Sequence, residues 1–377
     1  MKFAAFTTVA GSAGEATNAE EHIDNLRQQT ILAEELGFEA MWLGEHHFGP
    51  YAVGDLPNPI LLGADLAART SRIRIGQMAN IAPWWHPIRL AEDVAILDNL
   101  TRGRVEVGFG RGIWPYEGPQ FHPNADPRKD AENRELFQET VEIAREIWTN
   151  EYFSYQGTNY RFPADGTAFS HPLYPPNPAW QDGVRVTKLR VTPRPYQKPH
   201  PPLWMTVSTD RSVTTAAALG LKACYWQPPA RRIRERMELY AEVRTEREGR
   251  PFALAEDQAV MRSTYVASSM EEARRDAEES IMSAFVFNDP FRGRQVFTNP
   301  GEVLGDDVKL DWDFLEPRSL LVGSPEDVVG KIEELKEICH LDYLLVEFSH
   351  LGLPVAKSLR NLETFATRVM PHFAGDS

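Results

Sequence analysis

Cysteine is nearly absent from this chain of 377 residues, which contains only Cys224 and Cys339. Neither lies in a redox or metal-binding spacing, so a disulfide scaffold and a zinc finger are excluded and a reducing cytoplasm is expected. Basic residues are also few, because 40 Lys and Arg stand against 54 Asp and Glu, a net charge of −14. Without a basic stripe that could displace counterions from phosphates, no nucleic-acid partner is expected.

Long apolar runs are lacking too. The run that opens the chain stops at Thr7, which is too short for the apolar region of a signal peptide. No window has enough consecutive apolar residues to span a bilayer, so no membrane partner is expected. The composition, with 42% hydrophobic and 25% charged residues, is typical of a cytoplasmic protein with one large domain or two average ones.

What the chain does contain is an alternation of short apolar runs with longer amphipathic stretches. A capping box at Asn18 and Glu21, Pro87 at a first helical turn, the pair Asp126-Pro127 and the pair Ser324-Pro325 mark expected helix starts. Strands are predicted over residues 2–8, 39–43, 72–79, 104–109, 203–207, 223–226, 259–267 and 343–348.

Eight consecutive βα units with right-handed crossovers close into a barrel. The sequence therefore predicts an α/β protein, a single (β/α)8 TIM barrel domain over residues 1–377. An open, doubly wound sheet is the less favoured alternative. Two insertions are expected, at about 151–202, which includes a hairpin turning at Gln156-Gly157, and at about 285–317.

The active site of such a barrel lies at the carboxyl ends of its strands. Glu45, His46 and His47 follow the second strand. Metal-binding barrels commonly space two histidines as His-x-His, whereas adjacent histidines point to opposite sides of a strand. No metal site is therefore expected, and a catalytic or flavin-facing histidine is favoured over a structural one.

Three further stretches at strand ends allow two interpretations each. The glycines around Arg111 let its guanidinium approach an anion, or they form a tight turn with a surface arginine. Ser208 and Thr209 precede a helix, where they can bind a phosphate or simply cap the helix. Trp84 and Trp85 follow the third strand, where they can form an apolar wall for a flat ring or belong to the core or a subunit interface.

Together these stretches resemble the bacterial luciferase family of flavin-dependent monooxygenases. The resemblance extends over nearly the whole chain, and the order and spacing of its pieces are more specific than any single one. The matching pieces are Gly37-Phe38, Trp42-Leu43, Glu45-His46-His47-Phe48, the run 86–93, Gly103-Arg104, the run 108–112, the run 322–326 and Val369-Met370-Pro371.

The resemblance implies a barrel that binds reduced FMN at its strand ends. His46 matches the active-site histidine, and Met78-Ala79 matches a non-prolyl cis peptide beneath the isoalloxazine ring. The residues that match the family's contacts to the phosphate are Arg111, Arg134, Ser208 and Thr209.

The resemblance also implies that reduced FMN and oxygen form a C4a-(hydro)peroxide that oxygenates a small organic substrate. His46 is expected to act on this group as a general acid or base. Trp84, Trp85, Trp114 and the 285–317 segment, which occupies the place of the family's mobile loop, are expected to exclude water. Gly110 is a departure, since luciferase has a reactive cysteine beside the flavin there, which puts the aldehyde substrate in doubt.

Reduced flavin is expected from a separate reductase, because no dinucleotide-binding fingerprint is found, and a homodimer is expected by resemblance.

The nearest alternative is a deazaflavin-dependent oxidoreductase of the same family that transfers hydride. A non-catalytic flavin-binding protein and a hydrolase on the same barrel are further alternatives. A glycosidase is disfavoured because Glu106 lies inside its strand, and a metal hydrolase because of the histidine spacing.

Overall fold

The computed structural model describes residues 1–8, 18–49, 56–305 and 307–375. By their internal contacts these residues form two compact units. The first comprises Met1–Asn80, Glu106–Gly108 and Leu203–Ser377, and the second comprises Ile81–Val105 and Phe109–Pro202. The expectation that the chain is one domain stays a prediction.

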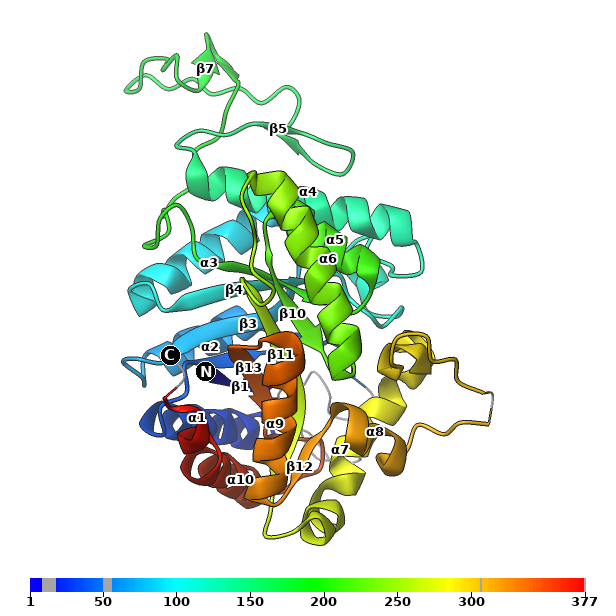
Figure 1. Cartoon of the computed structure of the whole chain (residues 1–377). Helices are drawn as coiled ribbons and strands as arrows, with labels where there is room; N and C mark the ends of the chain where they lie inside the picture. Colours follow the sequence, from blue (N-terminus) through cyan, green and yellow to red (C-terminus); the bar gives the residue numbers. More distant parts are fainter. Residues whose placement is uncertain (9–17, 50–55, 306, 376–377) are drawn as a thin grey trace. The chain divides into compact units, whose positions relative to one another are not determined.

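Eight parallel strands close into a barrel, which confirms the predicted (β/α)8 architecture. Their order is β10-β9-β4-β3-β2-β1-β13-β11, and a β10–β11 pairing closes the circle; β1, β13 and β11 lie side by side in Figure 1. The first unit contains all of these strands except the ends of β3 and β4. The strands are β1 (Lys2–Thr7), β2 (Ala40–Leu43), β3 (Arg74–Ile81), β4 (Val105–Gly110), β9 (Leu203–Val207), β10 (Lys222–Trp226), β11 (Gln258–Val266) and β13 (Tyr343–Glu347).

Alternate residues of these strands point into the barrel and fill it, as the two-residue period of a strand requires. Trp42 packs edge-on against Trp204, with ring centroids 5.6 Å apart. Glu106 accepts hydrogen bonds from Trp204 Nε1 and Arg74 Nε, both at 2.6 Å. The buried cluster inside the barrel comprises Ala4, Phe6, Ala40, Trp42, Met78, Trp204, Cys224, Ala259, Met261 and Leu345.

Helices of the first unit cover the outside of the strands. Neighbours pack in the order α5, α6, α9, α10 and α1. Asn18 caps α1, as predicted, with its side chain accepting from the N–H of Glu21 at 3.2 Å. The helices are α1 (Ala19–Glu35), α2 (Pro59–Ala67), α5 (Asp210–Leu219), α6 (Ala230–Glu248), α7 (Met270–Arg292), α8 (Trp312–Ser319), α9 (Pro325–Cys339) and α10 (Val355–Arg368); 3-10 turns lie at η3 (Arg294–Phe297) and η4 (Met370–Phe373).

The segment expected as an irregular insertion over 285–317 is helical at both ends. Helix α7 continues to Arg292 because Ala277, Ile281 and Phe285 keep one apolar face buried along it. Helix α8 begins at Trp312, and β12 (Leu321–Gly323) follows and pairs in parallel with the end of β11. Neither α8 nor β12 was predicted from the sequence. For β12 the reason is its length, because three residues are too few to show a periodic pattern.

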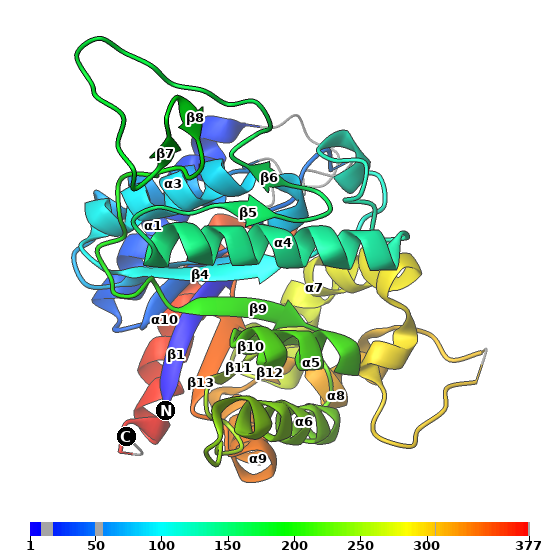
Figure 2. The same ribbon diagram turned by 90° about the horizontal axis from the view of Figure 1, so that it is seen from above.

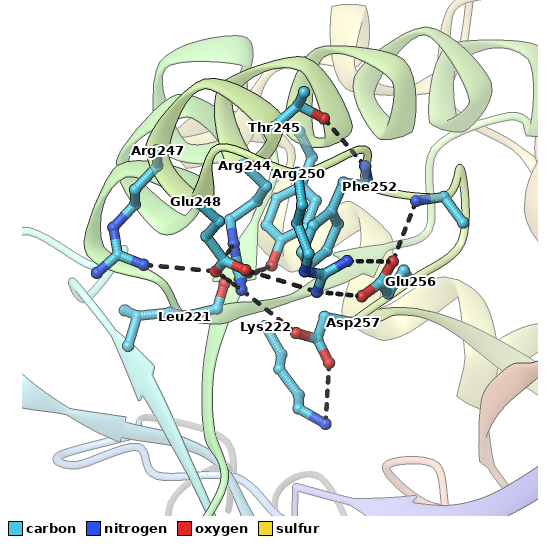
Figure 3. Close-up of polar contacts among 12 residues, drawn as sticks. Leu221, Lys222, Arg244, Thr245, Arg247, Glu248, Arg250, Phe252, Glu256 and Asp257 are labelled. Atoms are coloured by element: carbon cyan, nitrogen blue, oxygen red, sulfur yellow. Dashed lines mark hydrogen bonds and ion pairs between the residues drawn. The ribbon is translucent and has the colours of Figure 1, made fainter.

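A dense cluster of ion pairs lies at the amino ends of β10 and β11 (Figure 3). Arg244 is buried, bonds Glu248, and has its guanidinium 4.4 Å from the Phe252 ring centroid. Lys222 and Asp257, which begin or precede these strands, pair at 3.1 Å. Because the amino ends of barrel strands contribute to stability and the carboxyl ends to chemistry, we interpret this cluster as structural.

The second unit contains η1 (Ala82–Trp84), α3 (Pro87–Thr101), η2 (Gly118–Gln120), α4 (Asp130–Thr149) and two short hairpins. Figure 2 shows α4 alongside α3 and the first hairpin, β5 (Tyr155–Gln156) with β6 (Arg161–Phe162), which confirms the predicted hairpin. Glu139 of α4 holds the turn by accepting from the N–H of Thr158 at 2.8 Å. The second hairpin pairs β7 (Gln181–Asp182) with β8 (Arg185–Val186).

Helix α4 begins at Asp130, four residues after the Asp126 that was expected to start it. The Asp126 carboxylate accepts from the N–H and the guanidinium of Arg128, at 2.9 and 3.0 Å, which closes a turn ahead of the helix. An Asp-Pro pair therefore starts a turn here rather than a helix.

Candidate functional site

His46 lies three residues beyond the end of β2, at the carboxyl end of the barrel. The chain keeps its pairing with β1 as far as Gly44, whose N–H donates to the carbonyl of Thr7 at 3.0 Å. His46 and His47 are half-buried, and His47 Nε2 lies 3.2 Å from a carboxylate oxygen of the buried Glu45. His47 is thus held by its own loop, while the catalytic role expected of His46 stays a prediction.

The peptide bond between Met78 and Ala79 is cis, as the sequence resemblance implied. The bond lies near the carboxyl end of β3, and both residues are buried. Gln77 and Asn80 flank it and are also fully buried. Within the described ranges, Gln77 Nε2 and Asn80 Oδ1 have no hydrogen-bond partner, so a buried donor and a buried acceptor lie on either side of the cis bond.

Ser208 and Thr209 connect β9 to α5. Thr209 is the N-cap of α5 and forms a capping box with Ser212. The N–H groups of Ser208 and Thr209 both donate to Ser212 Oγ at 3.0 Å. Thr209 is therefore confirmed as the helix cap, and phosphate binding by Ser208 and Thr209 stays a prediction. Their N–H groups would have to exchange the Ser212 hydroxyl for a phosphate in order to bind one.

In the second unit, one carboxylate brings the two predicted phosphate arginines together. Asp130, the first residue of α4, accepts from Arg111 Nη2 at 2.8 Å and from Arg134 Nη2 at 2.5 Å. The Arg111 guanidinium, followed by that of Arg134, lowers the pKa of Asp130 to about 2. The i, i+4 spacing of Asp130 and Arg134 is the sequence signal that could have identified Asp130 as their shared partner.

The predicted substrate-pocket tryptophans belong to the interior of this second unit. Trp84, in η1, is buried and stacks on Phe121 with ring centroids 5.5 Å apart. Trp114 is 1% exposed and stacks on Tyr116 at 5.9 Å, while Trp85 is half-buried. Gly112, beyond Gly110, has φ +80° and brings its backbone to the Trp84 ring, where an added Cβ would lie 3.1 Å from the ring.

A polar chain at the carboxyl ends of β10, β11 and β13 was missed by sequence reasoning. Gln227 Nε2 donates to Ser263 Oγ at 2.8 Å, and the Ser263 hydroxyl donates to Glu347 Oε2 at 2.7 Å. Register places Ser263 beside Glu347, on alternate positions that also carry Met261 and Leu345 of the interior cluster. A carboxylate that ends an apolar strand, as Glu347 does, was the available signal.

Burial dominates the electrostatics of this polar chain. It raises the pKa of Glu347 from 4.5 to about 7, and it lowers the pKa of His350, whose Nδ1 lies 3.8 Å from Glu347, from 6.5 to about 4. Both groups are thus neutral in weakly acidic solution. A carboxyl that titrates near neutrality at the active end of a barrel can hold or release a proton.

The remaining candidate groups have structural roles. Glu106 uses its two oxygens on Trp204 and Arg74, so the glycosidase alternative loses its carboxylate. Burial raises the pKa of Cys224 to about 12 and that of Cys339 to about 11, so both remain thiols. Among the described residues, no three His, Cys, Asp or Glu side chains gather as a metal site would require, and no helix is long and apolar enough to cross a membrane.

Comparison with known proteins identifies relatives of the whole chain. The profile of the luciferase-like monooxygenase family matches residues 1–339. The oxygenase component of the flavin-dependent trigonelline monooxygenase of Acinetobacter baylyi is 25% identical, over 99% of this chain and 96% of that protein.

Two solved structures share the fold, each with a TM-score of 0.78. The monooxygenase RslO1 of Streptomyces bottropensis is 26% identical and covers 99% of this chain and 100% of its own. The oxygenating constituent of the 3,6-diketocamphane monooxygenase of Pseudomonas putida, a type II Baeyer-Villiger monooxygenase in complex with FMN, is 23% identical and covers 98% of each chain.

Proposed function

Because the chain belongs to the luciferase-like monooxygenase family, we propose that it uses reduced FMN and molecular oxygen to oxygenate a small organic substrate. Family membership makes it an enzyme, a flavin-dependent monooxygenase. The identity of the flavin as FMN and the residues that hold it are the finer parts of the proposal. The pair of guanidiniums gathered at Asp130 is the observation that carries it.

The arginine pair fits a doubly charged phosphate. Arg111 and Arg134 have side chains that are only 18% and 23% exposed, and both guanidiniums pair with the carboxylate of Asp130. An FMN phosphate would accept charge-assisted hydrogen bonds worth about 1.5–3 kcal/mol each from these guanidiniums. Gly110 precedes Arg111 and lets the backbone approach the ligand. Ser208 and Thr209, in the first unit, stay phosphate ligands predicted by the resemblance.

The cis peptide fits the tricyclic ring of the flavin. Met78 and Ala79 offer a small apolar surface, and the unpartnered polar atoms of Gln77 and Asn80 match a ring that has N–H and carbonyl groups at its edge. Bound reduced flavin supplies electrons to oxygen. His46 would hold or move a proton at the reacting oxygen, and the aromatic side chains of Trp84, Trp85 and Trp114 would keep water out.

Substitution of the arginines tests the phosphate site. We expect Arg111→Ala and Arg134→Ala each to weaken FMN binding by about 2–5 kcal/mol, as for loss of a buried charge partner. Arg128→Ala is the matched control, because Arg128 lies in the same segment but pairs with Asp126 at the surface. Flavin fluorescence titration measures all three, and equal dissociation constants for Arg111→Ala, Arg128→Ala and the unaltered protein would remove the phosphate site.

Oxygen dependence separates the proposal from its alternatives. With an aldehyde or cyclic ketone as substrate, we expect oxygenated product to form from reduced FMN in air and none to form under nitrogen. A deazaflavin enzyme would instead transfer hydride under nitrogen, and a non-catalytic flavin carrier would bind FMN without turnover. The name of the trigonelline enzyme, an oxygenase component, supports a separate reductase as partner. The homodimer stays a prediction.

The two histidines after β2 provide a paired test of proton transfer. With an aldehyde or cyclic ketone that the enzyme converts, His46→Ala is expected to keep FMN affinity but to release more hydrogen peroxide per product. His47→Ala is the control, because His47 is engaged with Glu45. Equal ratios of product to peroxide in the two variants would take His46 out of the mechanism.

A further inference from the structure

Arg292, the last residue of α7, lies against the carboxyl end of β10. Its guanidinium carbon is 3.9 Å from the centroid of the Trp226 ring, and Trp226 is the last residue of that strand. Trp226 packs against both the cluster inside the barrel and the cluster beneath α7 and α8. The guanidinium therefore lies at the end of the barrel where barrel enzymes bind their substrates.

Among the described residues, none balances the charge of Arg292. Within the part of the chain that the structure describes, its buried Nε has no hydrogen-bond partner and no carboxylate forms an ion pair with it. The nearest acid in sequence, Asp289, pairs with Arg294 at 3.1 Å instead. Burial lowers the pKa of Arg292 to about 10, which still leaves it charged at neutral pH.

Arg262, a buried arginine of the same unit, shows what a structural role looks like. The guanidinium of Arg262 donates to the carbonyls of Met261 and Pro228, at 3.2 and 2.5 Å, so its donors are used. For Arg292 the described residues supply only the face of an indole, in a cation–π contact. Arg292 is half-buried with its Nε fully covered, and among the described residues no ion pair compensates this partial loss of water.

We propose that Arg292, supported by the ring of Trp226, binds an anionic group, a carboxylate, of the small organic substrate. The inference deepens the proposed function and rests on it. The planar guanidinium keeps N–H donors at its edge while its face lies on the indole, and this edge matches a carboxylate with two parallel hydrogen bonds. Phe285, stacked on Trp226 at 5.6 Å, makes the surroundings apolar and suits an aromatic acid.

The test compares Arg292→Leu with Arg294→Leu, using benzoate as the anionic probe and benzamide as its neutral counterpart. Because Arg292 is half-buried and has no ion pair among the described residues, Arg292→Leu is expected to leave the ligand-free protein as stable as before or more stable. Arg294→Leu breaks an ion pair and lowers stability. Binding of benzoate, measured by calorimetry, is expected to fall about tenfold to a hundredfold in Arg292→Leu only, as loss of a charge-assisted contact requires. Arg292→Lys is expected to restore part of this binding.

The outcomes separate the sources of the anion. Benzoate that binds no more tightly than benzamide, or equally well in Arg292→Leu, overturns the proposal. Loss of stability in Arg292→Leu with benzoate binding retained assigns the residue to the helix end, where a basic side chain favours the helix dipole. Weaker FMN binding with unaltered benzoate binding assigns Arg292 to the flavin phosphate and also overturns it. Failure of every form to bind FMN refutes the proposed function, whatever the benzoate result.

Discussion

Replacing Glu347 with Gln should make the pH dependence of stability visible, because it removes one half of a compensated pair. Between pH 4.5 and 6.5 the folded protein keeps a proton on Glu347 and none on His350, since their pKa values are about 7 and about 4. The unfolded chain does the reverse, with His350 protonated and Glu347 ionised. Both states bind one proton, so this pair contributes no slope to the unfolding free energy there.

The magnitude follows from the raised pKa of Glu347. A group held protonated in the folded state loses its stabilising contribution as the pH rises from the unfolded value towards the folded one. For a pKa raised from 4.5 to about 7, at about 1.4 kcal/mol per pH unit, the loss is about 3 kcal/mol. Glu347→Gln lacks this loss, so its stability relative to the unaltered protein should rise by about that amount between pH 4.5 and 7.

Urea unfolding at intervals from pH 4 to pH 8 measures this difference. As the pH falls from 6.5 to 4, the variant should lose more stability than the unaltered protein, because His350 then titrates without the compensating Glu347. Glu333→Gln, the same substitution on the exposed face of α9, controls for the change of side chain. A difference between Glu347→Gln and the unaltered protein that stays constant with pH would refute the claim that burial holds this carboxyl neutral.

The remaining predictions concern packing and ion pairs. Gly76→Ala places a Cβ 2.2 Å from the Trp42 ring and should cost at least about 2 kcal/mol in urea unfolding, whereas Gly330→Ala, in open space on α9, should stabilise by about 1 kcal/mol. Similar effects of the two would contradict the tight packing of the interior. Arg244→Met should lower stability by about 1.5–3 kcal/mol because it removes the hydrogen bonds from this buried guanidinium to Glu248 and to the Tyr240 hydroxyl, while FMN affinity stays the same. Altered FMN affinity would contradict the structural role of this cluster.

Much of the fold could be predicted because the alternation of apolar runs and helix signals is strong over the whole chain. Each expected barrel strand overlaps an observed one, with ends that differ by a few residues. The predicted elements were wrong or missing where the same local sequence can form either of two structures. Asp126 folds back on Arg128 and closes a turn, so α4 starts at Asp130, and β12 is a strand only because β11 lies beside it. Such tertiary effects leave no periodic pattern in the sequence.

The candidate site was predictable in its residue types but not in its internal bonds. The sequence indicated Arg111 and Arg134, yet the carboxylate that joins them lies at an ordinary helix start. Ser208 and Thr209 were ambiguous, and the structure shows their N–H groups engaged by Ser212. Glu347 and Arg292 could not be identified from the sequence as candidate functional residues. The burial of Glu347, and the lack of a counter-charge for Arg292 among the described residues, are properties of the fold.

The tryptophans packed within the barrel have a consequence for how substrates reach the active site. Trp42 and Trp204 are in contact and Glu106 is hydrogen-bonded to Trp204 and Arg74, so side chains fill the barrel between these strands. Because the interior is a packed core rather than a pore, ligands reach the active site from the carboxyl ends of the strands. Exchange of the segments at this end, such as the stretch from α7 to β12, can thus alter which substrates bind, while the packed interior keeps the barrel stable.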